Sequence, residues 1–258
     1  PLYSSAASDV YKRQIKDDTL FILEANPRAS RTMPFVSKVT GNQIIKAGTL
    51  LMLGHSLDSI KKTTNYLNSS TNKVAIKKAI FPWSRFPAED TMLGPEMKAT
   101  GEVLGIGRSF GVALNKAYAA AGVEINENEK GIFVSLSDQE KPNFIKIVKT
   151  YSDLGFKIYS TYGTGEYLKN NEINSTIVGR ADETFPTSLT ILQDKLISLV
   201  INTPTFANEY TDGWKIRRLS HETGVAVVSS VREAEAFLKA FLETTKSFED
   251  MEAIQNVS

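Results

Sequence analysis

The second half of the chain alternates short apolar strands with amphipathic helices five times between residues 131 and 245. The strand-like runs are residues 132–136, 156–160, 176–178, 199–202 and 225–229. The helical patterns are residues 142–154, 165–170, 187–195, 213–222 and 231–242. Because a strand followed by a crossover helix returns parallel to the first strand, this alternation predicts a five-stranded parallel sheet with helices on both faces, a doubly wound α/β domain.

Polar side chains follow the predicted strands at the points where they end. Residues 160–165 (STYGTG) follow the second strand and open a helix, so their glycines and hydroxyls can approach an anion at a positive helix end. Asn202 and Thr203 follow the fourth strand, Arg180 follows the third and Lys141 follows the first. Ligands of doubly wound folds bind at the carboxyl ends of the strands. The sequence therefore predicts a small anion site at that edge of the sheet.

The first half has a different pattern. A turn at residues 17–18 separates two extended runs and predicts a hairpin, and residues 42–53 have helical spacing that Gly54 ends. We expect a polar connector over 57–73, a strand over 74–81 and a helix over 110–121. The run GEVLGIG (residues 101–107) lacks the third glycine of a dinucleotide fingerprint, so we interpret it as a structural segment.

These patterns suggest limits for the parts of the chain. Residues 1–14 have no initiator Met, no apolar signal region and no helical or strand period, and we interpret them as a non-native or mis-joined leader, with a disordered tail as the alternative. We expect a first domain over 15–122, an acidic linker over 123–130, a second domain over 131–245 and a polar tail over 246–258.

Composition narrows the possible functions. The chain has 30 basic and 29 acidic residues and a net charge of +1, so its bulk charge gives no argument for binding nucleic acid or an anionic membrane. It has no cysteine and two histidines, which excludes disulfide scaffolds, thiolate zinc sites and histidine-rich metal sites. No apolar run approaches the roughly 20 residues that cross a bilayer. We expect a soluble, cytoplasmic protein.

One segment of the first half carries groups suited to phosphoryl chemistry. Glu24, Asn26 and Arg28 follow one another at spacings of two residues, which places them on one face of an extended stretch. Glu24 and Asn26 offer oxygen ligands to Mg²⁺, and Arg28 can pair with phosphoryl oxygens. The alternative is an exposed strand end with incidental charges.

The run LEANPRASRTMPFVSKVTG (residues 23–41) resembles the end of the second ATP-grasp domain of carbamoyl-phosphate synthase large chains, and FPWSRFPAEDTMLGPEMKATGEVLGIG (81–107) is similar to the same family just downstream. The resemblance implies a partial α+β ATP-grasp lobe over residues 15–122. It also implies that Glu24 and Asn26 ligate Mg²⁺ or Mn²⁺ and that Arg28 contacts the phosphate of ATP. The family has a further metal-bridging side chain about twelve residues earlier, where this chain has Lys12.

The second half is similar to the methylglyoxal synthase-like domain that ends the same large chains and binds nucleotide effectors such as UMP or IMP. By this resemblance the residues that hold the effector phosphate or base are Ser135, Lys141, Thr161, Thr164, Arg180, Asn202 and Thr203. No histidine follows a predicted strand, so methylglyoxal synthase chemistry is not expected.

Taken together, the resemblance implies a fragment of a glutamine-dependent carbamoyl-phosphate synthase large chain, a carbon–nitrogen ligase that uses ATP, bicarbonate and ammonia from a glutamine amidotransferase small chain. Such an enzyme serves arginine or pyrimidine synthesis. Most of the ATP-binding apparatus has no counterpart here, so we expect the fragment alone to be inactive. The alternatives are a stand-alone nucleotide-sensing regulatory module without catalysis and a different ATP-grasp ligase.

Overall fold

The computed structural model describes residues 10–26, 30, 32–65, 72–81, 83, 86, 91, 101–123, 131–180, 183, 186–203 and 211–244. The chain divides into two compact units. The first consists of Pro1–Ala75 with Glu252–Ser258, and the second is Ile76–Met251.

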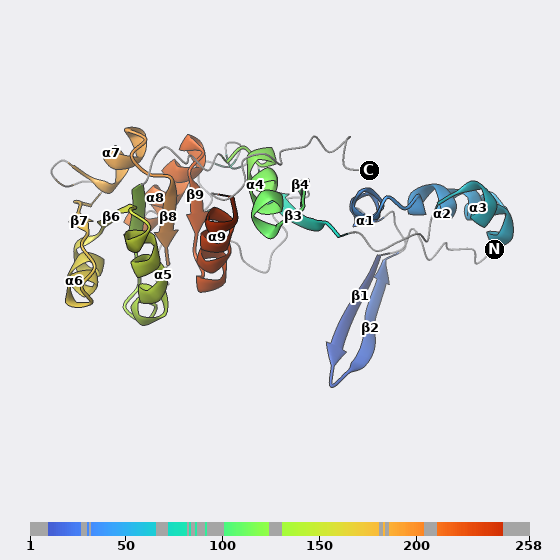
Figure 1. Ribbon diagram of the computed structural model, residues 1–258, viewed down its shortest axis with the longest axis horizontal. Helices are drawn as coiled ribbons and strands as arrows, with labels where there is room; N and C mark the ends of the chain where they lie inside the picture. Colours follow the sequence, from blue (N-terminus) through green and yellow to red (C-terminus); the bar gives the residue numbers. More distant parts are fainter. Residues whose placement is uncertain are drawn as a thin grey trace. The chain divides into compact units, whose positions relative to one another are not determined.

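The first unit contains an antiparallel hairpin of β1 (Val10–Lys16) and β2 (Thr19–Asn26), drawn as the two dark blue arrows of Figure 1. Asp17 and Asp18 in the turn have φ angles of 49° and 55°. Two successive positive φ values are typical of a type I′ turn, whose twist matches that of the paired strands. The predicted hairpin is confirmed, but β1 starts at Val10, so the expectation of no strand before Ile15 was wrong.

Three helices follow the hairpin: α1 (Thr32–Thr40), α2 (Ile44–Met52) and α3 (Leu57–Thr63). Helix α2 was predicted, and Gly54 follows it with a φ of 89°. Helix α3 replaces the first part of the predicted polar connector. Its N-cap Ser56 accepts a hydrogen bond from the backbone N–H of Ser59 at 3.3 Å, and Ile60 is 1% exposed, so a cap and one buried contact suffice for a short helix.

The second unit is built on the predicted parallel sheet. Its strands are β5 (Gly131–Ser135), β6 (Lys157–Ser160), β7 (Thr176–Ile177), β8 (Leu199–Asn202) and β9 (Ala226–Val228). They pair in the order β7-β6-β5-β8-β9, and all pairs are parallel. The order reverses at β5, the first strand, which is the topological switch of a doubly wound sheet. The predicted doubly wound α/β domain is confirmed, whereas the partial ATP-grasp lobe over residues 15–122 stays a prediction.

Five helices connect and follow these strands. They are α5 (Lys141–Asp153), α6 (Tyr162–Asn170), α7 (Ser188–Gln193), α8 (Asp212–Thr223) and α9 (Val231–Thr244). All were predicted, although α6 starts three residues before the expected Gly165. Its first turn therefore contains Gly163 and Thr164, which the sequence had placed in a loop.

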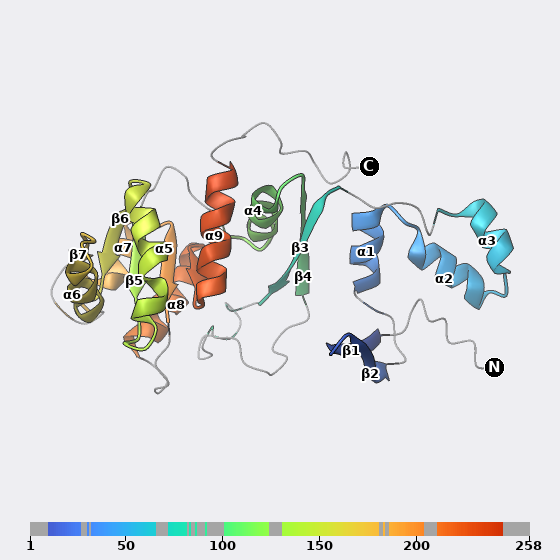
Figure 2. The ribbon, with the colours of Figure 1, turned by 60° about the horizontal axis from the view of Figure 1, so that its bottom comes forward.

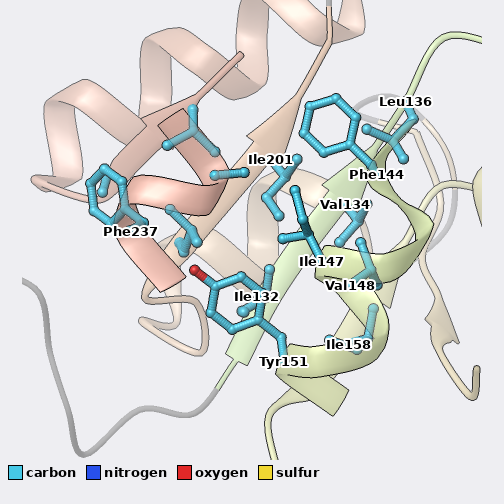
Figure 3. Packing of buried hydrophobic residues seen from close by; sticks show 14 of the residues in the cluster. Ile132, Val134, Leu136, Phe144, Ile147, Val148, Tyr151, Ile158, Ile201 and Phe237 are labelled. Atoms are coloured by element: carbon cyan, nitrogen blue, oxygen red, sulfur yellow. The ribbon is translucent and has the colours of Figure 1, made fainter. Parts of the chain in front are cut away.

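The helices bury both faces of this sheet. On one face α5, α6 and α9 cover Ile132 and Val134 of β5, and on the other α7 and α8 cover Phe133. Figure 2 shows α5 and α9 beside each other, and Figure 3 shows Tyr151 and Ile147 of α5 packed toward Ile132 and Val134. Successive strand residues that alternate between two apolar clusters are what a sheet buried on both sides requires.

The segment before the sheet also belongs to this compact unit. Strand β3 (Val74–Ile80) pairs with β4 (Gly101–Gly107), and α4 (Phe110–Ala120) packs on both β4 and α9. The side chain of Glu243 in α9 accepts a hydrogen bond from the backbone N–H of Gly111 at 2.7 Å, at the positive end of α4. The compact unit thus starts at Ile76. The limits at residues 122 and 131, which the change of sequence pattern and the acidic connector suggested, stay predictions. Residues 124–130 of the predicted linker lie outside the described residues.

Gly105 of β4 supports the structural interpretation of the GEVLGIG run. A Cβ atom there would overlap the carbonyl oxygen of Ala113 and lie 2.6 Å from the backbone nitrogen of Ala117, whereas one at Gly101 would meet nothing nearer than 3.4 Å. Glycine therefore lets α4 pack directly on β4.

We predict that Gly105→Ala destabilises the protein by about 2 kcal/mol or more because helix and strand must separate. Gly101→Ala in the same strand is the matched control and should change stability by less than about 1 kcal/mol. Urea unfolding followed by circular dichroism measures both. Equal midpoints for the two variants would contradict the close packing.

His221 of α8 generates a second prediction. Burial, followed by the charges of Lys78 and Arg218, lowers its pKa to about 4 from the ordinary 6.5. A lowered pKa means that the unfolded chain takes up the proton first, so stability is present above pH 6.5 and falls as the pH drops toward 4.

The free energy of unfolding should therefore decrease between pH 7 and pH 4.5, and His221→Gln should show a smaller decrease. Burial also lowers the pKa of Lys78, and the charge of Glu233 opposes that shift. The same pH dependence in both proteins would show that His221 is not the group responsible.

Candidate functional site

Three strands of the sheet end side by side at its carboxyl edge. Ser135 of β5 lies beside Asn202 of β8 in the strand register, and Val134 lies beside Ser160 of β6. The helices α5, α6 and α8 follow β5, β6 and β8 in the chain and each leads to the next parallel strand, so their amino-terminal ends face the same edge. This edge, from Ser135 to Thr203, is the candidate site.

Two threonines hold the loop after β5 by their hydroxyls. The backbone N–H of Leu136 donates to Thr164 Oγ1 at 3.1 Å, and Thr164 is 1% exposed. The backbone N–H of Ser137 donates to Thr203 Oγ1 at 2.7 Å. The backbone N–H of Thr203 in turn donates to the carbonyl oxygen of Ser135 at 3.1 Å. The predicted residues Ser135, Thr164 and Thr203 are thus brought together, with Ser137 added to them.

Helix α6 starts without the side-chain cap that its sequence could provide. Thr161 occupies the N-cap position, but its side chain accepts no hydrogen bond from the first turn and its hydroxyl instead donates to Thr164 Oγ1 at 3.2 Å. By contrast the N-cap side chains of α3, α4, α7 and α8 each accept a backbone N–H of their helix. The first N–H groups of α6 therefore lack the acceptor that a capping threonine supplies.

Lys141 adds positive charge beside this helix end. It is the first residue of α5, its side chain is 12% exposed, and its Nζ lies 2.5 Å from Oδ1 of the exposed Asp138. The same Nζ lies 3.8 Å from the point where a Cβ atom added to Gly163, in the first turn of α6, would lie. A lysine next to two amino-terminal helix ends is electrostatically unfavourable unless a negative charge is held there.

The buried side chain of Asn202 forms another part of the edge. Asn202 is 2% exposed, and its Oδ1 accepts a hydrogen bond from Arg217 Nη1 at 2.7 Å. Its Nδ2 lies 3.5 Å from the carbonyl oxygen of Ser135, the limit of a hydrogen bond. Arg217, in α8, is itself 5% exposed.

Arg180 lies at the outside of the group. Its side chain is 73% exposed, and its Nε is 3.9 Å from Oδ2 of Asp212, the first residue of α8. An exposed ion pair of this length contributes little stability and leaves the guanidinium able to move. Arg180 is therefore placed near the start of α8, at the border of the edge where Asn202 lies.

Sequence reasoning missed three residues of this site: Ser137, Asp212 and Arg217. Two successive arginines of α8, Arg217 and Arg218, are typical of a solvent-facing surface, but both are buried. Arg218 forms a salt bridge, with its Nε 2.8 Å from Oε1 of Glu222. Ile216 and Ser220 are buried too, so a wide stripe of α8 faces inward. The sequence does not show this stripe clearly because arginine is usually a surface residue.

The first unit carries the predicted metal ligands. Glu24 and Asn26 are two residues apart near the end of β2, which places them on one face of the strand. The register sets Lys12 directly opposite Glu24, and a protonated lysine has no lone pair for a metal ion. The side chain of Asn26 and all of Arg28 lie outside the described residues. In the described part of the chain, no three His, Asp or Glu side chains converge on a possible metal position. The described residues thus supply only part of the oxygen ligands that Mg²⁺ requires.

Comparison with known proteins agrees with the family resemblance noted in the sequence. Residues 143–229 match the family described as MGS-like domain. A carbamoyl phosphate synthase large chain of Nostoc sp. is 38% identical over 92% of this chain, which covers 21% of that protein. The C-terminal sections of the large chain from Aquifex aeolicus and Methanocaldococcus jannaschii are each 36% identical, over 92% and 91% of this chain.

The chain therefore spans between about a fifth and a half of the length of these relatives, covering 46% of the Aquifex protein and 39% of the Methanocaldococcus protein. The resemblance read from the residues is confirmed. Among the described residues, no helix combines the length and the apolar character that crossing a bilayer requires.

Proposed function

We propose that this chain, which belongs to the carbamoyl phosphate synthase large chains and carries an MGS-like domain, binds a phosphate-bearing nucleotide effector at the carboxyl edge of its parallel sheet. One observation carries the proposal: α6 has a threonine at its N-cap that does not cap it, while the Lys141 ammonium lies beside the same helix end. Both features leave positive potential that an anion would neutralise.

The donors at this edge suit a phosphate group. The amino-terminal N–H groups of α6 and the Lys141 ammonium offer several hydrogen bonds and a full charge within one short segment of structure. Asp138, which pairs with Lys141, is 93% exposed, so it can move away when a ligand phosphate takes its place. Arg180 at the border can reach a second oxygen because its side chain is exposed.

Family resemblance supplies the identity of the effector as a nucleotide such as UMP or IMP. The predicted residues Ser135, Lys141, Thr161, Thr164, Arg180, Asn202 and Thr203 are its proposed contacts. The proposal makes the second unit a regulatory part of an ATP-dependent carbon–nitrogen ligase that forms carbamoyl phosphate with a glutamine amidotransferase small chain. The cytoplasmic location and the arginine or pyrimidine pathway stay predictions.

The synthase part of this proposal concerns the parent protein. There Glu24 and Asn26 would hold Mg²⁺ or Mn²⁺, which would supply positive charge to the phosphoryl transfer, and Arg28 would neutralise a phosphoryl oxygen. In this chain Lys12 pairs with Glu24 in the strand register, and a protonated lysine has no lone pair to offer a metal ion. The alternative is a regulatory module without catalysis. It is supported by the difference between the two sites: the hairpin has a lysine opposite its predicted metal ligand, whereas hydrogen bonds join the side chains of the second-unit site.

Effector binding is tested by calorimetric titration of the full chain with UMP and with IMP. Lys141→Met should weaken binding by about 10- to 100-fold because a charge-assisted hydrogen bond is lost. Lys149→Met, on the same helix and far from its start, removes an equal charge and should change the affinity less than twofold. If neither nucleotide binds at millimolar concentration, the effector site is absent.

Catalysis is tested on the same preparation. We expect no ADP from ATP, Mg²⁺ and carbamate, because the chain holds only a few of the groups that such phosphoryl transfer needs. A coupled assay for ADP measures the rate. Carbamate-dependent ADP formation, absent in a Glu24→Gln variant, would contradict the expectation and restore the catalytic assignment.

A further inference from the structure

The contact between Asn202 and Arg217 determines which atoms Asn202 presents to the candidate site. Arg217 Nη1 lies 2.7 Å from Oδ1 of Asn202, and both residues are buried, at 5% and 2% exposed. A guanidinium has five N–H donors and no acceptor, so only the oxygen of the amide can face it. The amide orientation of Asn202 is therefore fixed by chemistry, and its NH₂ group is turned away from Arg217.

The NH₂ group of Asn202 has room for a further partner. It lies 3.5 Å from the carbonyl oxygen of Ser135, a long contact that engages one of its two hydrogens at most. The carbonyl of Ser135 already accepts the backbone N–H of Thr203 at 3.1 Å. An amide donor at the end of β8, beside the threonine cluster, is thus poised to donate to an oxygen of a ligand at this edge.

Gly213 at the start of α8 leaves room for the contact between Asn202 and Arg217. A Cβ atom at Gly213 would lie 3.1 Å from Arg217 Nη1 and 3.5 Å from Asn202 Oδ1. Glycine at this position therefore leaves space for the guanidinium, which reaches back one helical turn toward β8. The charge of Arg217 also adds positive potential behind Asn202, at the same edge as Lys141.

We propose that Arg217 is a positioning residue that holds Asn202 as a hydrogen-bond donor, so that the site selects ligands with an acceptor oxygen at this point. The proposal rests on the proposed effector site and assigns a role to a residue that does not itself touch the ligand. Its ligand class is a nucleoside monophosphate that directs a phosphate or carbonyl oxygen toward Asn202.

Asn202→Asp tests the donor directly in the full chain. The carboxylate keeps an oxygen toward Arg217 and forms an ion pair with it, but replaces the NH₂ donor by an acceptor of negative charge. We expect binding of UMP and IMP, measured by calorimetry, to weaken by at least tenfold. The thermal unfolding midpoint without ligand should stay the same or rise, a combination that a merely structural role of Asn202 would not produce.

Arg217→Gln tests the positioning role. Glutamine offers both a donor and an acceptor, so the amide of Asn202 can turn over, and affinity should fall about fivefold or more. Arg218→Gln removes the adjacent buried guanidinium, which bonds to Glu222 and to the carbonyl oxygen of Phe86 instead, and should leave affinity within twofold. In the Asn202→Asp background, Arg217→Gln should cause no further loss of affinity, since the donor is already absent.

The outcomes separate this inference from the proposed function. If the unchanged chain binds neither UMP, IMP nor inorganic phosphate, the effector site and the inference both fail. If it binds but Asn202→Asp binds equally well, only the inference fails. Affinity within twofold for Arg217→Gln, or losses that add in the double variant, would likewise overturn the positioning role. If Arg217→Gln does not fold, the Asn202→Asp result decides alone.

Discussion

The parallel pairing of β5 with both β6 and β8 is the constraint on which the site depends. Because Val134 lies beside Ser160 and Ser135 beside Asn202, three strands end together. The strand order reverses at β5, so the chain leaves these ends in different directions, and ligands of such folds bind at this switch point. The threonines, Lys141 and Asn202 are adjacent only because this register holds.

Much of this arrangement could be predicted from the sequence. Apolar runs that alternate with helical spacing indicated every strand and helix of the parallel-sheet domain. Because Lys141, Thr164 and Asn202 follow or end parallel strands, they were expected at one edge of the sheet. The hairpin at Asp17 and Asp18 was equally visible, since its turn residues tolerate positive φ. Such signals are local, and each element follows from residues close together in the chain.

Side-chain partners and burial could not be predicted in the same way. Thr161 is a good N-cap residue by sequence, yet its hydroxyl donates to Thr164 Oγ1. This happens because Thr164 is held against the loop after β5, where it accepts the backbone N–H of Leu136. Buried charged side chains are rare, so the sequence gives no sign that Arg217 is buried, and its contact with Asn202 comes from α8 lying on β8. Helix α3 depended on one cap and one buried isoleucine, too weak a pattern to recognise.

The central claim is that an anion is held by the uncapped start of α6. Amide chemical shifts of the ¹⁵N-labelled chain, recorded while UMP is added, test it most directly. The account predicts that the largest shifts occur at Tyr162, Gly163 and Thr164, with smaller shifts at the ends of β5 and β8, and that they saturate together. Shifts that are absent from these residues, or that are scattered over the surface without saturating, would contradict it.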